Sequence, residues 1–578
     1  MASFTWRGPA APPYAVLNLG PLALMQPLVD QLDIEAIIDR HLPPDPRQEF
    51  SHGQVLRLLL LARLSSPTAL VNVAQWAQKT GADILSNIPV DKLNDDRLGR
   101  ALDAFFEHRH SILGSVTAQA LQLSGLTLNR LHFDPTSLVL TGAYETAEPR
   151  APLPPGQPLL GDASVPPAHI TYGYNADTKM IQAGQLALVD ELGAVPVFMH
   201  CLDGNRNGHP AIQQTFELAH HHLNLPEDLL LISDRGTCSV EHLARLHRQG
   251  YQALCAAQWQ DYRALYDTWA DQLHWQPASF LSVEQQRRRL TNSSLPQEHY
   301  EIAVRKHTLT DPTDGSDLPV RLIFVHSTAD AREARQHREK NIAKMRAGFE
   351  QLQAKILRGH PQCTTASIQK QVHTLLHKRA AARYFSWRLV PLTPEERQAL
   401  PAPLPGHRRA TQRLEFQVDA AAAQADERYD GRSVLVTTAA CGYSADRLFS
   451  MYKEQNYVET LHHQWKTPLA VSPVFLKSPR RVEALVCLLQ IALQAYQVLE
   501  RLYRQRVAAE APPQERRMTS ERLLRAFDVY GLLVRQTRCG RVVHPTRLST
   551  RQRQILDHFL FPTPAQTLKR LLMPEPYP

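Results

Sequence analysis

The 578-residue sequence predicts an α/β core that is interrupted by a mixed α+β insertion domain and preceded by an all-helical N-terminal domain. Two apolar, strand-like segments predict the core, because each of them closes on an aspartate, Asp134 or Asp234. Helical periodicity over residues 15–115 predicts the N-terminal domain. A third acidic motif, at Glu459, lies 225 residues after Asp234. One compact core needs far fewer residues than that, so an insertion is expected between them.

Composition indicates the kind of partner, the absence of a cysteine framework and the compartment that we expect for this protein. Lys and Arg total 64 against 56 for Asp and Glu, a formal charge of +8 that suits a polyanionic partner. The seven cysteines are scattered without a CxxC pair, so neither a disulfide framework nor a zinc site is indicated. The longest leucine run, Leu58–Leu61, lies between two arginines and is far too short to span a membrane. We therefore expect a cytoplasmic, nucleoid-associated protein with no membrane contact.

The N-terminal domain is expected to cover residues 1–118. A turn-rich segment from His41 breaks the pattern, because proline lacks the amide donor and fixes φ. The helices expected on either side are Leu22–Leu32, Ile34–Ile38, Gln54–Leu64 and Asp96–Phe106. Contact with DNA ends in the manner of a helix-turn-helix, dimerisation and simple packing all remain open for this domain.

The first part of the core is expected over residues 124–258. Its first strand begins at Leu126 and is ended by Asp134 and the following proline. Pro149–Pro167 is expected to form an extended surface loop. The later elements expected are strands at Ala168–Tyr174, Gln185–Asp190 and Asp228–Asp234, a helix at Pro210–His222, a helix at Ser239–Gly250 and a strand at Tyr251–Ala256. Ligands gather beyond the carboxyl ends of such strands, although aspartate is also common in turns and helix caps.

The insertion domain is expected over 259–428, the second part of the core over 429–500, and a helical C-terminal region over 501–578. The expected elements are strands at Glu301–Val304, Val320–His326 and Asp430–Thr437, helices at Ala331–Leu357 and Ile368–Arg383, and a helix capped by Ser444 that carries Glu459. The arginines at 501, 504, 506, 516 and 517 form either a solvated face or a patch that follows DNA phosphates.

The segment from Tyr452 to Lys466 carries the most chemistry. Steps of seven residues return to nearly the same face of a helix, so Tyr452, Glu459 and Lys466 line up, flanked by Gln455 and His462. A carboxylate, a phenol and an ammonium on one stripe suit a divalent metal beside a bound phosphate. A solvated helix face gives the same pattern.

These residues resemble the DDE transposases of bacterial insertion sequences. The Y-x2-R-x3-E-x6-K signature of one subgroup falls on Tyr452, Gln455, Glu459 and Lys466, with glutamine where the signature has arginine. Further matches are Trp465-Lys-Thr467, Phe133-Asp-Pro-Thr136 and Ser233-Asp-Arg-Gly-Thr237, and Asn94–Asp103 resembles one branch of the subgroup. The likeness extends from about residue 15 to residue 500.

The resemblance implies a ribonuclease-H-like catalytic core with β-β-β-α-β-α-β order and a metal site for Mg²⁺, with Mn²⁺ able to substitute. Asp134 is expected to bridge two ions, with Asp234 and Glu459 each holding one side. DNA phosphates would be contacted by Tyr452, Gln455, Lys466, Arg235 and Thr237. Trp465 is expected either to stack on an extruded base or to lie in the core.

The activity implied is metal-dependent cleavage at insertion-sequence ends and strand transfer into target DNA. Its partners would be double-stranded DNA, at the terminal inverted repeats and the target, and a second copy of the chain in the synaptic complex. Two alternatives remain: a catalytically inactive, transposase-derived DNA-binding protein, and a nuclease without strand transfer.

Overall fold

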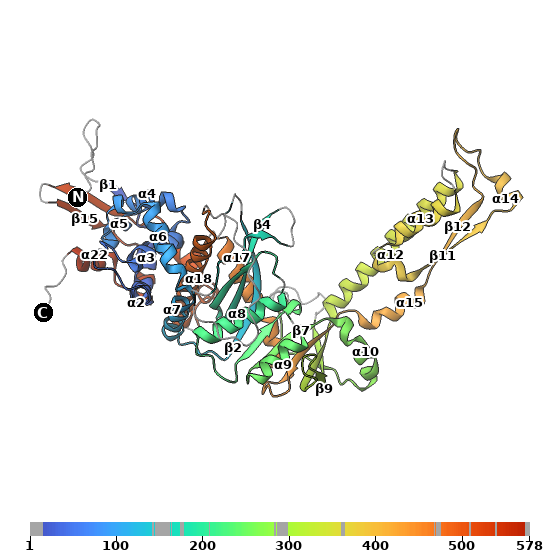
Figure 1. Ribbon diagram of the computed structural model, residues 1–578, viewed down its shortest axis with the longest axis horizontal. Coiled ribbons are helices and arrows are strands. Elements are labelled where there is room, and N and C mark those ends of the chain that lie inside the picture. The colour runs from blue at the N-terminus through green and yellow to red at the C-terminus, as the bar shows by residue number, and fades with distance from the viewer. Residues whose placement is uncertain are drawn as a thin grey trace.

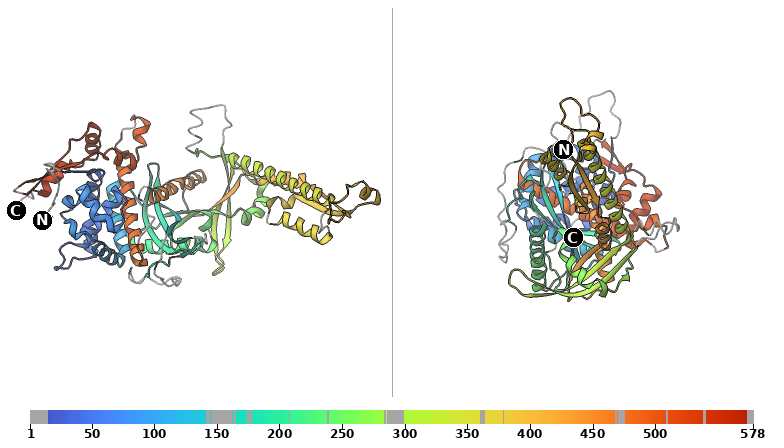
Figure 2. Two further views of the ribbon diagram at one scale, coloured as in Figure 1. Left: turned by 90° about the horizontal axis from the view of Figure 1, so that it is seen from above. Right: turned by 90° about the vertical axis from the view of Figure 1, so that its right-hand side faces the viewer.

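The computed structural model is an elongated molecule with a helical body at one end, a central sheet and a projecting arm at the other end (Figures 1 and 2). It describes residues 15–572, except 141–143, 145–161, 163–164, 174–177, 207, 238, 283–284, 286–298, 360–363, 378, 468, 470–475, 508–509 and 538–539. Most of the loop expected at Pro149–Pro167 and the turn expected after Tyr174 lie outside the described residues.

The helical body contains the N-terminal domain together with the end of the chain. Its N-terminal elements are α1 (Leu22–Gln31), α2 (Ile34–His41), α3 (His52–Ser65), η1 (Leu70–Asn72), α4 (Val73–Thr80), α5 (Ala82–Ser86), η2 (Val90–Lys92), α6 (Asp95–Phe106) and α7 (Arg109–Ser124). Ser51 begins α3 with a capping box and Asn94 caps α6, as these residue types do at helix starts. The helices expected from periodicity in this domain are confirmed.

The N-terminal domain and the C-terminal region are each not purely helical, so both expectations need correction. Strand β1 (Ala15–Leu17) pairs with β14 (Leu532–Thr537), which pairs with β15 (Gly540–Pro545) in a three-stranded sheet. The first described strand therefore lies with the C-terminal elements at the helical body (Figure 1). The C-terminal helices are α19 (Pro513–Arg516), α20 (Ser520–Arg525), α21 (Thr550–Phe559) and α22 (Pro564–Leu572).

The central sheet has the order β5-β4-β2-β6-β7 in its first part. These strands are β2 (Arg130–Leu140), β3 (Thr171–Tyr172), β4 (Lys179–Asp190), β5 (Gly193–Asp203), β6 (Leu230–Ser233) and β7 (Gln252–Ala257). Strands β2, β6 and β7 are parallel, whereas β4 runs antiparallel to β2. The connecting helices are α8 (Gly208–His222) and α9 (Val240–Arg248). With the two-residue β3 left aside, these elements follow the expected β-β-β-α-β-α-β order.

Three details of this part differ from the expectations. Strand β2 does not end at Asp134 but continues through Pro135 to Leu140, because Pro135 pairs only with Gly184 of β4 at this point. The third long strand is β5, whereas Ala168–Tyr174 supplies only the two-residue β3. Cys255 in β7 is disulfide-bonded, although the cysteine spacing indicated no disulfide.

The sheet continues into the region assigned to the insertion. Beyond β7 it adds β13 (Arg432–Thr438), β10 (Asp317–Ser327), β9 (Tyr300–Thr310) and β8 (Gln276–Pro277). Helix α10 (Trp259–Trp269) packs on β13, and η5 (Ala270–Gln272) follows it. The segment that leaves the sheet therefore begins at α12, after residue 327, rather than at residue 259.

The arm projects from the sheet with a core of its own (Figure 1). It consists of α12 (Thr328–Leu357), α13 (Thr365–Leu376), η6 (Ala380–Tyr384), β11 (Phe385–Pro391), α14 (Pro394–Ala399), β12 (Gln412–Val418), α15 (Ala420–Ala425) and η7 (Asp426–Tyr429). Phe349 is fully buried in this core. At its base Arg338 forms a bidentate pair with Asp430, at 2.6 and 2.7 Å. The helix expected at Ile368–Arg383 ends earlier, at Leu376.

Helix α18 (Pro479–Arg506) joins the helical body to the sheet, packing against α3, α6 and α7 on one side and β5 on the other. It is long and apolar enough to cross a membrane, but its apolar window lies entirely inside the protein. Its glutamines are paired: Gln490 accepts from Gln185 at 2.7 Å, and Gln494 donates to Thr117 at 2.6 Å. Arg501 is buried and holds Asp190, so neither role considered for this arginine applies.

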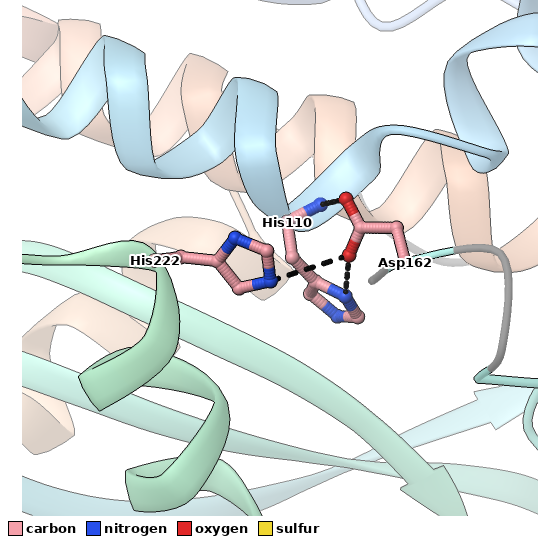
Figure 3. A group of neighbouring side chains, drawn as sticks. All are labelled: His110, Asp162 and His222. Carbon is pink, nitrogen blue, oxygen red and sulfur yellow. Dashed lines mark hydrogen bonds and ion pairs between the residues drawn. The ribbon is translucent and has the colours of Figure 1, made fainter. Parts of the chain in front are cut away.

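A buried polar cluster lies beside α18 where α7 meets β5 and α8 (Figure 3). Asp162 accepts from the backbone N–H groups of His110 and Ser111, and its Oδ1 is 2.6 Å from His110 Nδ1 and 3.5 Å from His222 Nε2. Burial opposes its ionisation, but these hydrogen bonds and the histidines hold the pKa of Asp162 well below its usual range. At 2.6 Å, His110 and Asp162 are hydrogen-bonded rather than ligands of one ion, since ligand atoms about 2.0–2.2 Å from a metal lie farther apart.

We expect Glu483→Gln to destabilise the protein by about 3–5 kcal/mol, because it leaves the Arg109 guanidinium buried without its counter-charge. Arg109 Nε lies 2.7 Å from Glu483 Oε1, and both side chains are at most 1% exposed. The check is the free energy of unfolding from urea titration. Asp96→Asn, which breaks the exposed pair with Arg100, is the control and should change little. Equal losses from the two variants would contradict this account of the junction.

Candidate active site

The first two aspartates lie side by side because their strands are parallel neighbours. In the pairing of β2 with β6, Phe133 is opposite Ser233, so Asp134 and Asp234 follow at matching positions. The carboxyl ends of parallel strands meet at one edge of the sheet, where ligands commonly bind. Asp134 is partly buried, with 23% of its side chain exposed, whereas Asp234 is exposed.

The segment that carries the third carboxylate forms two short helices rather than one. Ser444 caps α16 (Ala445–Lys453) as expected, but the helix stops there and α17 (Asn456–Lys466) begins after a break. Tyr452 therefore belongs to α16, while Glu459 lies in the first turn of α17. In the break, Glu454 Oε2 is 2.9 Å from the Nη2 of Arg130, so the start of β2 holds the junction in place.

The three carboxylates act on one another electrostatically. The pKa of Asp134 is raised to about 7, first by burial and then by the charges of Asp234 and Glu459, while Lys466 opposes the shift. Among the described residues, the groups of three ligands within 4.8 Å of one another include His110 but not these carboxylates. The three acids thus form a more open group than the sets of three ligands that contain His110.

Two further side chains lie against the aspartates. The Tyr452 hydroxyl donates to Asp234 Oδ1 at 3.0 Å, and burial together with Asp234 raises the pKa of Tyr452. His462 Nδ1 lies 3.4 Å from Asp134 Oδ2, and burial, assisted by Lys466, lowers the pKa of the imidazole to about 4. His462 is therefore neutral at pH 7. In the sequence it stood out only as a residue flanking the Tyr-Glu-Lys stripe.

The remaining residues that were expected to contact DNA differ in how exposed their side chains are. Lys466 and Arg235 are exposed and lie close enough to influence the pKa of Asp134 and of Tyr452, respectively. Trp465, in contrast, is fully buried in the main core, so the alternative of a core tryptophan is correct and base stacking on it is not available. Gln455 is half-buried just before α17. Thr237 ends η4 (Arg235–Thr237), and its side chain lies outside the described residues.

The donor set suits a hard divalent cation. Mg²⁺ takes oxygen ligands, usually one or two carboxylates completed by water and substrate phosphates. Asp134, Asp234 and Glu459 supply such oxygens, and the pKa of Asp134 is raised by burial and then by the two neighbouring carboxylates, whose charge a bound cation would offset. The site is thus suited in chemistry to binding Mg²⁺ or Mn²⁺.

This electrostatic arrangement predicts a pH-dependent stability. A carboxyl group with a raised folded-state pKa favours folding while protonated, and that contribution is lost as the pH rises from about 4 to about 7. In EDTA, Asp134→Asn should therefore raise the melting temperature at pH 8 and leave it nearly unchanged at pH 4, as measured by calorimetry. Asp228→Asn, at the exposed turn before β6, is the control. A destabilised Asp134→Asn at pH 8 would contradict the prediction.

Two family models match the chain. The family model described as transposase DDE domain matches residues 151–494, more than half of the chain. That match includes Asp234, Glu459 and the arm, and begins after Asp134. A second model, a domain of unknown function named DUF4277, matches residues 14–119, the helices of the N-terminal domain. No curated protein sequence matches the chain. The chain belongs to the transposase DDE domain family.

Proposed function

We propose that this protein is a metal-dependent DNA transposase that cuts DNA at the ends of its own insertion sequence and transfers them into a target. The observation that carries the proposal is the convergence of Asp134, Asp234 and Glu459 at one edge of the sheet. The order β5-β4-β2-β6-β7, with β4 antiparallel, supports a ribonuclease-H-like core. The placement of Tyr452 and Lys466 beside the acids supports the subgroup with the Y-x2-R-x3-E-x6-K signature.

In this proposal Asp134, Asp234 and Glu459 would hold two Mg²⁺ ions, and Mn²⁺ would be able to take their place. When bound, such ions activate the attacking oxygen and stabilise the leaving oxygen of a phosphodiester. Tyr452 orients Asp234 through its hydroxyl, and His462 lies beside Asp134. Lys466 and Arg235 are exposed cations beside the acids, where they position the DNA backbone.

The partners proposed are double-stranded DNA, at terminal inverted repeats and target, and a second copy of the chain, because two ends require two active sites. The setting proposed is the bacterial cytoplasm. A nuclease with the same core would cut without joining, so a strand-transfer product distinguishes the two. An inactive derivative would bind ends without cutting.

Loss of any one carboxylate should abolish cleavage while sparing end binding. We expect Asp134→Asn, Asp234→Asn and Glu459→Gln each to slow nicking of a labelled end duplex in Mg²⁺ by roughly a thousandfold or more, the scale of several kcal/mol of lost charge stabilisation. Asp228→Asn, at the opposite end of β6, should cut normally. Cleavage that survives one of the three substitutions removes that residue from the metal site.

Position 455 offers a test of the DNA contact. Glutamine is neutral there, whereas arginine would add a charged, bidentate phosphate donor. Gln455→Arg should tighten end binding and steepen the dependence of log K on log salt by about 1. Gln249→Arg, which adds the same charge at the exposed end of α9, controls for net charge. Unchanged affinity and slope in Gln455→Arg would place position 455 away from the DNA.

A further inference from the structure

One buried arginine in the N-terminal domain has no counter-charge. Arg63 lies in the last turn of α3 and is only 6% exposed. Among the described residues it has no hydrogen-bond or ion-pair partner, and its Nε is a buried donor without an acceptor. Burial alone lowers its pKa to about 10. Arg57 on the same helix shows the usual arrangement, because its Nε donates to Asp30 at 3.1 Å.

A buried unpaired guanidinium is costly, so its surroundings should explain it. Arg63 lines a cavity of about 140 Å³. The cavity lies between the end of α3, η1, the start of α6 and the start of α18, and its walls include Leu70 and Leu485. Val71, which also lines it, is 70% exposed, so the cavity opens to solvent.

A second arginine and the start of a helix also lie at this cavity. Arg481 also lines it, held against α6 by a bidentate contact with Asp103 at 2.9 and 2.6 Å. Helix α18 begins two residues before Arg481 and no side chain caps it, so the positive end of a 28-residue helix lies at the cavity. Asp95 is the one carboxylate among the lining residues, and it does not pair with Arg63. Arg63 therefore has no contacting counter-charge among the described residues, although the formal charges of the two arginines and of Asp95 and Asp103 cancel.

We propose that this cavity binds the phosphate group of a DNA backbone through Arg63. The guanidinium presents several N–H donors in a plane, which matches phosphate oxygens, and a tetrahedral oxyanion supplies the missing negative charge. The choice of DNA as the source rests on the proposed function; free inorganic phosphate offers the same chemistry. The site lies in the N-terminal domain and is built from residues separate from the carboxylate cluster.

The first arm of the test uses inorganic phosphate alone. The melting temperature of the full chain is compared in phosphate and in chloride at equal ionic strength, for wild type, Arg63→Met and Lys79→Met. Lys79 is an exposed lysine of α4, so its loss changes the charge of the same domain without touching the cavity. Phosphate should stabilise wild type and Lys79→Met but not Arg63→Met.

The same arm shows whether Arg63→Met folds. In chloride this variant should melt at or above the wild-type temperature, because it removes a buried charge with no partner. A large drop in chloride would mean that Arg63 is satisfied within the fold, and that would overturn the proposal. Equal phosphate stabilisation in wild type and Arg63→Met would overturn it as well.

The second arm uses a short duplex in EDTA, where binding is measured without cleavage. For Arg63→Met we expect about a tenfold loss of affinity, with the salt slope reduced by about 1, and little change for Lys79→Met. If Arg63→Met lost the stabilisation by phosphate but bound the duplex with unchanged affinity, the cavity would be a site for free phosphate and not for the DNA backbone. Neither arm requires catalysis. A failure of the proposed transposase activity would appear only in the cleavage assay, so it can be distinguished from a failure of the anion site.

Discussion

The parallel pairing of β2 with β6 is the constraint on which the candidate active site depends. It brings Asp134 and Asp234 to matching positions at one edge of the sheet, where burial and mutual repulsion raise the pKa of Asp134 to about 7. Neighbouring side chains contact both acids: Tyr452 donates a hydrogen bond to Asp234, and His462 Nδ1 lies 3.4 Å from Asp134. The negative charge of the carboxylates is the physical reason to expect a divalent cation at this edge of the sheet.

The rest of the architecture supports this edge. Helix α18 backs the sheet through β5 and joins it to the N-terminal domain by the fully buried pair of Arg109 and Glu483. The long interval before Glu459 is accounted for by the outer strands of the sheet and by an arm with its own core. Arg130 and Glu454 then connect the returning chain to the first residue of β2.

Much of this was predictable from local patterns. Apolar runs located the parallel strands, and capping residues such as Ser444 located helix starts, because both signals depend on neighbours in sequence. The missing details depend on tertiary contacts. Pairing with β4 extends β2 past Asp134, and the contact between Glu454 and Arg130 lies where α16 and α17 separate. Burial of Trp465 and the approach of His462 to Asp134 likewise require the packed structure.

The central claim is that residues from β2, the end of β6 and α17 surround the same metal ions. Local cleavage of the polypeptide by bound Fe²⁺, with ascorbate and peroxide, tests it directly, because hydroxyl radicals cut the chain close to the ion. The account predicts cuts near residues 134, 234 and 459 together, all suppressed by excess Mg²⁺. Cuts near only one of these positions, or cuts that Mg²⁺ does not suppress, would contradict it.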